Sequence, residues 1–163
     1  MALTKVQAEG INLADAFAFT GSVTGASILQ VKGTTSASES TTDSSSFVAN
    51  GLSALSITPS SASNKVLILF GVHLFQASGG GSACLTLFRD STDLNNTTYG
   101  WGYTNSGSPN FINGALLDNP NTTSSVSYQI KHRVVSGSGN VYSQINNNTS
   151  TFTIMEIGSP ILT

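Results

Sequence analysis

The chain has 163 residues, of which 39% are hydrophobic, 8% aromatic and 9% charged, and its formal net charge at pH 7 is -2. This length suits one well-buried domain rather than two, and the charged share lies far below the roughly 25% typical of soluble domains. The six basic residues are scattered, which excludes the clustered Lys and Arg that nucleic acid requires. We therefore expect a surface of uncharged polar groups and no nucleic-acid partner.

Residues 1–27 differ from the rest of the chain and are predicted to form a separate N-terminal attachment arm. Their apolar spacing suits neither a long helix nor a regular strand, and they lack the uninterrupted apolar stretch of a signal peptide. No segment approaches the length of a membrane helix, so we expect no membrane insertion. The arm carries more apolar side chains than a free tail would, which favours burial against a partner: Leu3, Val6, Ile11, Leu13, Phe17 and Phe19.

Residues 28–163 are predicted to form one β-sandwich domain, because short β-type runs alternate with Gly, Pro, Asn, Asp and Ser. The apolar run 66–70 predicts a central strand, the Gly/Ser-rich segment 136–140 predicts a hairpin turn, and the Ser/Thr tract 34–46 predicts a loop or edge strand. The predicted strands are enough for two packed sheets: 28–35, 46–49, 52–58, 65–76, 83–90, 97–103, 111–117, 124–135, 140–145 and 151–157.

The chain is predicted not to be an enzyme, because its reactive residues form no recognisable constellation. His73 lies in an apolar run typical of a core or interface histidine, and His132 is expected in a polar patch at a strand end. Cys84 is the sole cysteine and is expected to be a buried thiol. Asp90 and Asp93 lack the spacing of a calcium loop. We therefore expect no catalytic residues, no metal and no cofactor.

Three aromatic residues, Tyr99, Trp101 and Tyr103, alternate along the chain and are predicted to share one face of a strand. If that face is exposed, the rings provide a surface for a partner or a glycan. If it is buried, they belong to the core. The glycines at positions 100 and 102 suggest close packing on the other face, which favours a core or subunit interface over glycan binding.

One stretch resembles a known β module. The likeness runs through Ser56-Ile57-Thr58-Pro59-Ser60-Ser61-Ala62-Ser63-Asn64-Lys65-Val66-Leu67-Ile68, of which Ile57 to Ile68 is the most specific part, with further likeness in 28–31, 46–52, 87–91 and 153–157. Together these segments resemble a β module of tailed-phage virion structural proteins, notably tail-fibre-type proteins of aquatic phages. The resemblance covers most of residues 28–158. It implies a trimeric, jelly-roll-like antiparallel sandwich in a virion, with no cofactor and no catalytic residues to transfer.

These observations predict a structural virion protein, either a head decoration or cement protein or a short tail fibre. We expect it to be assembled in the cytoplasm of a bacterial host and docked through its arm on another virion protein of the capsid or tail. A sandwich with few charges and apolar strands on more than one face is expected to bury a face against identical copies, giving a homotrimer. The alternative is a receptor- or carbohydrate-binding tail-fibre tip that contacts host surface glycan.

Overall fold

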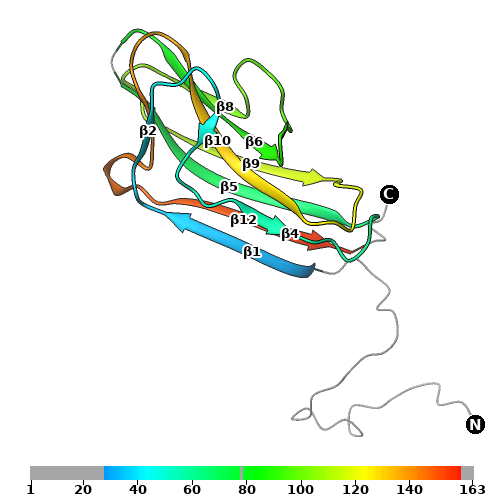
Figure 1. Ribbon diagram of the computed structural model, residues 1–163. Helices are drawn as coiled ribbons and strands as arrows, with labels where there is room; N and C mark the ends of the chain where they lie inside the picture. The colour runs from blue at the N-terminus through cyan, green and yellow to red at the C-terminus, as the bar shows by residue number, and fades with distance from the viewer. Residues whose placement is uncertain (1–27, 78, 159–163) are drawn as a thin grey trace, which may run out of the picture.

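The computed structural model describes residues 28–77 and 79–158, which form two antiparallel β-sheets packed face to face (Figure 1). The predicted all-β sandwich is thereby confirmed. The attachment arm predicted over residues 1–27, with its six apolar residues, lies outside the described residues.

Sheet A contains the first and last strands of the sandwich. It has six strands: β1 (Ile28–Ser36), β2 (Ser40–Thr42), β5 (Lys65–Gln76), β9 (Asn110–Asp118), β11 (Val141–Ser143) and β12 (Ser150–Ile157). A 3-10 turn, η2 (Ile145–Asn147), separates β11 from β12, and both of these strands pair with β5 along the same edge. β1 pairs with β12, and β2 pairs with β11. β1 and β2 therefore act as one interrupted strand, and β11 and β12 act as another.

Sheet B faces sheet A across the core. Its six strands are β3 (Val48–Ala49), β4 (Leu55–Ile57), β6 (Ser82–Arg89), β7 (Thr92–Asp93), β8 (Gly102–Asn105) and β10 (Val126–Ser136). β3 and β4 both pair with one edge of β10, and β7 and β8 both pair with one edge of β6. β10 and β6 are paired along most of their length and form the centre of the sheet.

When each interrupted strand is counted as one, the sandwich has eight segments, which in chain order are β1 with β2, β3 with β4, β5, β6, β7 with β8, β9, β10, and β11 with β12. Numbered along the chain, sheet A has the order first, eighth, third, sixth, and sheet B has the order second, seventh, fourth, fifth. Segments one and eight, two and seven, three and six, and four and five are thus nested antiparallel pairs. This is the arrangement of a jelly roll, and the jelly-roll-like topology that the resemblance implied is confirmed.

β5 shows how the sequence forms the core. Its alternate residues from Val66 to Gln76 point inward and are at most 5% exposed, as the period of two requires. The strand is central in sheet A, as its apolar run predicted. Its other face is not buried, however, because the sandwich has two layers and no described element covers the outside of sheet A.

The predicted hairpin at 136–140 is wrong. β10 ends at Ser136 in sheet B and β11 begins at Val141 in sheet A, so the intervening turn carries the chain from one sheet to the other. Val134 pairs with Ala83 of β6, and Val141 pairs with Gln76 of β5. β10 and β11 therefore pair with strands of different sheets and not with each other. The turn sequence is compatible with a hairpin but does not determine one.

The Ser/Thr tract is part of the domain, as predicted: it contributes the short edge strand β2. The segment 58–64 is held by a buried carboxylate. Glu156, only 1% exposed, accepts hydrogen bonds from Ser60 N (2.6 Å), Ser60 Oγ (2.8 Å), Asn64 Nδ2 (2.6 Å) and Gln30 Nε2 (2.5 Å). Burial alone would raise the pKa of Glu156, but these hydrogen bonds outweigh it and lower the pKa below its usual value. One side chain thus fastens the 58–64 loop and the edge strand β1 to β12.

Candidate functional site

The outer face of sheet A carries several exposed apolar side chains. Six of its side chains, here called the apolar face, come from four strands and point away from the core: Val31, Leu67, Leu69, Phe111, Leu117 and Met155. Val31 is 56% exposed, Leu117 48% and Phe111 45%. Contiguous apolar surface of this kind on a folded domain marks an interaction site.

The strand register places these residues in a continuous row. Val31 lies opposite Met155, Met155 opposite Leu67, and Leu67 opposite Leu117. Directly opposed residues on one face have Cβ atoms about 4.5–5.5 Å apart, so the row crosses the whole sheet without a polar interruption. Leu69 and its partner Ala115 extend it in the next row.

The apolar face carries almost no charge. Among the described residues of sheet A, Glu156, Asp118 and the edge residue Lys32 lie on the core-facing side of their strands, and Lys65 lies at the end of the face where β5 begins. At its other end the His73 ring lies 4.5 Å from the Phe111 ring, centroid to centroid. His73 is therefore a half-buried surface histidine beside an aromatic ring. Of the two expected positions, core or interface, it does not occupy the core.

The outer face of sheet B is different, because the chain itself covers part of it. Thr86, on this face, is fully buried and donates to Asp93 Oδ1 at 2.7 Å, and the segment after β7 returns across the same strand. Farther along, Lys131 lies 4.1 Å from the centre of the Phe88 ring, and Arg133 lies 4.5 Å from that of Phe47. This face is closed by its own loop and is cationic, so the two outer faces of the sandwich are chemically distinct.

Cys84 lies beneath that loop and is fully buried, which confirms the predicted buried thiol. Burial raises its pKa, although the neighbouring Arg133 acts in the opposite direction. Arg133 is the cross-strand partner of Cys84 and donates to Thr98 O at 2.9 Å. The raised pKa keeps the thiol protonated and unreactive at neutral pH.

The three aromatic residues predicted to share a strand face do not do so. Residues 97–101 form a turn with Gly100 at φ +56°, and β8 begins only at Gly102. Trp101 consequently packs against the core, edge to face with Phe70 at 5.8 Å. Tyr99 and Tyr103 remain together at the surface, with ring centroids 4.9 Å apart and exposures of 49% and 47%.

A shallow cavity of about 330 Å³ lies beside the Tyr103 ring. It is formed by the end of β8 and the turn into β9, and its lining is neutral: Tyr103, Thr104, Asn105, Ser108, Pro109 and Asn110. The turn is fixed from below, since Ser106 N donates to Gly81 O at 2.8 Å and Gly107 N donates to Gln76 O at 2.9 Å. We call Tyr99, Tyr103 and this lining the tyrosine pocket.

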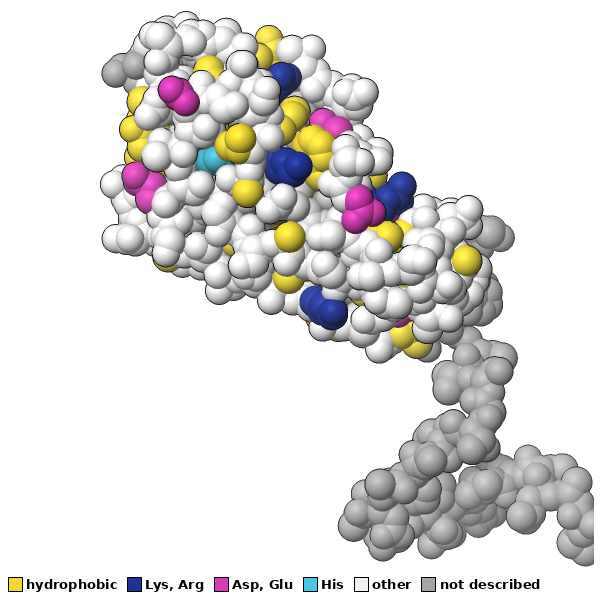
Figure 2. All heavy atoms as spheres, viewed as in Figure 1, with side chains coloured by type: hydrophobic (Ala, Val, Ile, Leu, Met, Phe, Trp, Pro, Cys, Tyr) yellow, Lys and Arg dark blue, Asp and Glu magenta, His cyan; other side chains and the backbone are white. Residues whose placement is uncertain are grey.

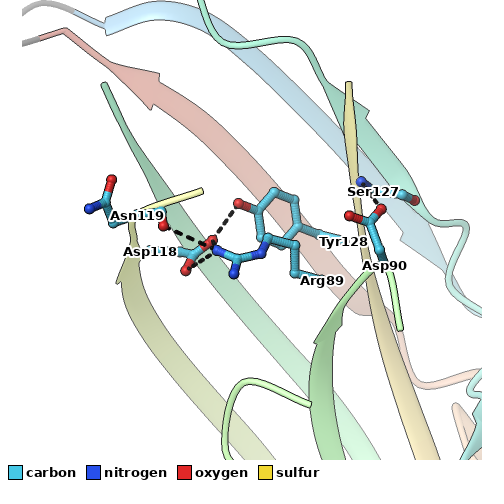
Figure 3. Close-up of polar contacts among 6 residues, drawn as sticks. All are labelled: Arg89, Asp90, Asp118, Asn119, Ser127 and Tyr128. Atoms are coloured by element: carbon cyan, nitrogen blue, oxygen red, sulfur yellow. Dashed lines mark hydrogen bonds and ion pairs between the residues drawn. The ribbon is translucent and has the colours of Figure 1, made fainter. Parts of the chain in front are cut away.

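A polar cluster joins the two sheets at the end where β9 stops. In Figure 3, Arg89 and Tyr128 of sheet B both point at Asp118 of sheet A. Arg89 Nη1 lies 2.8 and 2.9 Å from the two carboxylate oxygens, and the Tyr128 hydroxyl donates to Oδ2 at 2.6 Å. Burial and the adjacent carboxylate raise the pKa of Tyr128, which stays protonated as a donor. Arg89 Nη1, both carboxylate oxygens of Asp118 and the Tyr128 hydroxyl are engaged with one another, so we assign the cluster a structural role.

His132 lies inside the core, not in the polar patch that was expected for it. It is fully buried on β10, and its Nδ1 lies 2.9 Å from Ser143 Oγ of β11. Lys131 and Arg133 on either side point outward, so the Lys-His-Arg run is one inward residue between two outward ones. Burial lowers the pKa of His132 to about 4. The ring is neutral at physiological pH and contributes to packing.

Within residues 28–77 and 79–158, His, Cys, Asp and Glu nowhere gather in a group of three that could hold a metal ion. The same residues contain no helix with the length and apolar character needed to cross a bilayer. In Figure 2, few of the side chains on the visible face are charged, and most of the visible atoms belong to backbone or to uncharged side chains.

No family model matches the chain, and no curated protein matches it. Among solved structures, the chain is similar to a chain in the structure of infectious bursal disease virus, Gx strain, with a TM-score of 0.47 and 12% identity over 82% of this chain and 33% of that chain. A chain in the structure of the Gt strain gives a TM-score of 0.39 and 11% identity, covering 88% and 42%. The chain thus spans less than half the length of either, and likeness at this level does not extend to function.

Proposed function

We propose that the protein is a structural component of a tailed-phage virion that assembles into a homotrimer through the apolar face. The observation that carries the proposal is the unbroken row from Val31 across Met155 and Leu67 to Leu117. Burial of apolar surface stabilises a protein by about 25 cal/mol per Å². An isolated jelly roll leaves this row in water and does not gain that stabilisation. Assembly buries the row.

The size and charge of the apolar face favour a second copy of the chain as its partner. β5 has 12 residues, about 40 Å at 3.3 Å per residue, and four strands spaced about 4.8 Å apart give the whole outer face of sheet A, which contains the apolar face, an area on the order of 600 Å². A stable interface uses about 800 Å² per partner, so this face supplies most of what is needed. Because it is nearly uncharged, copies meet without like-charge repulsion. Three faces turned toward a common threefold axis would cover one another.

The virion setting rests on the resemblance of residues 28–158 to the β module of tail-fibre-type proteins. The segment 58–64, which lies within the most specific part of that resemblance, has a structural reason in this fold, because Ser60 and Asn64 bind the buried Glu156. We propose a head decoration or cement protein, or a short fibre, attached through residues 1–27 to a capsid or tail protein. On this proposal the protein has no catalytic activity and needs no cofactor.

The oligomeric state tests the assembly. Sedimentation equilibrium of the full chain should give three times the 16.8 kDa chain mass. A monomer at micromolar concentration would contradict assembly through the apolar face, and a dimer would contradict the threefold arrangement.

Particle composition tests the virion setting. Gold-labelled antibody against the sandwich should decorate purified particles of the phage that encodes the chain, on the head or the tail. A chain absent from particles would overturn the structural role. Substituting Phe17→Ser and Phe19→Ser in the full chain should remove it from particles without altering its circular dichroism, and undiminished incorporation would overturn the attachment by the arm.

A further inference from the structure

We propose that the tyrosine pocket binds a neutral saccharide. This activity goes beyond assembly, and it uses a surface that runs from β8 of sheet B to the start of β9 and shares no residue with the apolar face. Tyr103 and Asn105 lie on β8, the edge strand of sheet B, whereas the apolar face is the outside of sheet A.

The paired rings supply the stacking surface. Tyr99 and Tyr103 contact each other at 39° between ring planes, and each remains about half exposed. They come from a turn and an adjoining strand, so the pair presents two differently tilted aromatic planes side by side. The C–H faces of a pyranose ring pack on such planes through dispersion, and the phenol hydroxyls at the ring edges can bond sugar hydroxyls.

The cavity beside Tyr103 supplies neutral hydrogen-bonding groups. Asn110 Nδ2 donates to Tyr103 O at 3.1 Å, which fixes the amide and leaves its oxygen as an acceptor. Asn105 and Ser108, which carry an amide and a hydroxyl, also line the cavity and are exposed residues. A few placed polar groups beside an apolar surface are what orient a small ligand.

The charge of the pocket selects the class of saccharide. No Lys, Arg, Asp or Glu lines the cavity. Arg133 lies near this site, but its guanidinium already donates to Thr98 O and Ser45 O and lies over the Phe47 ring. Sialylated, uronic-acid-containing or phosphorylated sugars would therefore lose hydration of their charge without gaining a cation at the cavity in return. The turn is held beforehand by the backbone bonds of Ser106 and Gly107, so little ordering is needed on binding.

The position of the pocket suits contact with a distant surface. The sandwich begins at Ile28, which pairs with Ile157, and Ile157 in turn pairs with Lys65 at the start of β5. Asn110 pairs with Leu74 near the end of β5, about 30 Å along the strand at 3.3 Å per residue. The pocket therefore lies at the opposite end of the sandwich from the point where residue 28 joins the preceding chain.

The test is a binding assay of the full chain on immobilised oligosaccharides. Neutral oligosaccharides of glucose, galactose, mannose and N-acetylhexosamine are compared with sialylated and uronic-acid-containing ones, and the dissociation constant of each hit is measured by calorimetry. At least one neutral oligosaccharide should bind, and the variants Tyr99→Ala and Tyr103→Ala should each weaken that binding at least tenfold. Both rings are surface groups, so both variants should keep the native circular dichroism.

Tyr142→Ala is the matched control, because Tyr142 lies on β11 of the other sheet beside Phe75. It should leave the dissociation constant unchanged. Failure of every neutral oligosaccharide to bind, binding of charged saccharides alone, or equal affinity in Tyr103→Ala and the native chain would each overturn the proposal. None of these results depends on the oligomeric state or on particle labelling, so the saccharide site and the proposed assembly fail separately.

Discussion

Leu67 on β5 and Leu117 on β9 lie directly opposite each other on the outside of sheet A. Leu117 is 48% exposed although its strand neighbour Leu116 packs against the core. A two-layer sandwich buries only the inward side chain of each strand. The outward Leu117 is buried only if a partner covers it.

The variant Leu67→Lys should therefore abolish assembly without unfolding the domain. A charge at the centre of an apolar interface loses its hydration without a counter-ion and should weaken association at least tenfold. Gln129→Lys on β10, which points outward from the opposite sheet, is the control. Sedimentation should give the mass of one chain for Leu67→Lys and the native mass for Gln129→Lys. Equal masses for the two variants would place the interface elsewhere.

Stability should fall in acid partly because of His132. Its pKa is about 4 in the folded protein and 6.5 in the unfolded chain, so the unfolded state takes up the proton first. The contribution is fully present above pH 6.5 and is lost as the pH falls to about 4, by roughly 3 kcal/mol at 1.36 kcal/mol per pKa unit. Urea unfolding of the native chain and of His132→Gln between pH 4 and 7 measures this. The variant should show the shallower pH dependence, and parallel curves would contradict the assignment.

Glu156→Gln should destabilise the sandwich by about 2–3 kcal/mol. The substitution puts an amide N–H₂ in place of one carboxylate oxygen, so that either the Gln30 amide at Oε2 or the Ser60 and Asn64 donors at Oε1 face a donor instead of an acceptor. The exposed Glu39→Gln is the control, with an expected change within 0.5 kcal/mol. The free energy of unfolding in urea distinguishes them. Similar values for both would mean that the loop does not depend on this carboxylate.

Gly114→Ala should disturb the packing of Trp101. A Cβ at position 114 would overlap Phe70 and come within 2.6 Å of Trp101 Nε1, and overpacking of this kind costs about 1–3 kcal/mol. Gly33→Ala on β1 is the control, because its Cβ would meet Thr153 Oγ1 at 3.4 Å, an ordinary contact. The tryptophan emission spectrum and the free energy of unfolding should change in the first variant and stay native in the second.

Local patterns predicted the strands well because they depend on alternation and turn residues. β5 matches its predicted range of 65–76, and β1, β9 and β12 differ from theirs by a residue or so at an end. Pairing depends on distant segments and was less predictable. The turn at 136–140 fits a hairpin or a crossing between sheets equally well, and only the partners of β10 and β11 decide between them.

The candidate site could be predicted only in part, for related reasons. Alternation of Tyr99, Trp101 and Tyr103 implies one face only if the backbone is extended, and the left-handed Gly100 turns Trp101 into the core. A face buried against identical copies was expected, but its place in the fold was not predicted, because apolar residues on both sides of a strand are also what a fully buried strand shows. In a two-layer fold a strand is buried on one side only, so apolar residues on its other side indicate an interface.

The pairing of Ile28 with Ile157 has a practical consequence for engineering. The first and last strands of the sandwich begin and end at the same corner, so a short peptide could join them and new termini could be opened elsewhere, as in a circular permutant. Gly80 suits the new opening, because it has φ +67° in a turn with no neighbouring atoms within 4 Å of where a side chain would begin. A permutant opened there would carry fused cargo at the opposite end of the sandwich from Ile28.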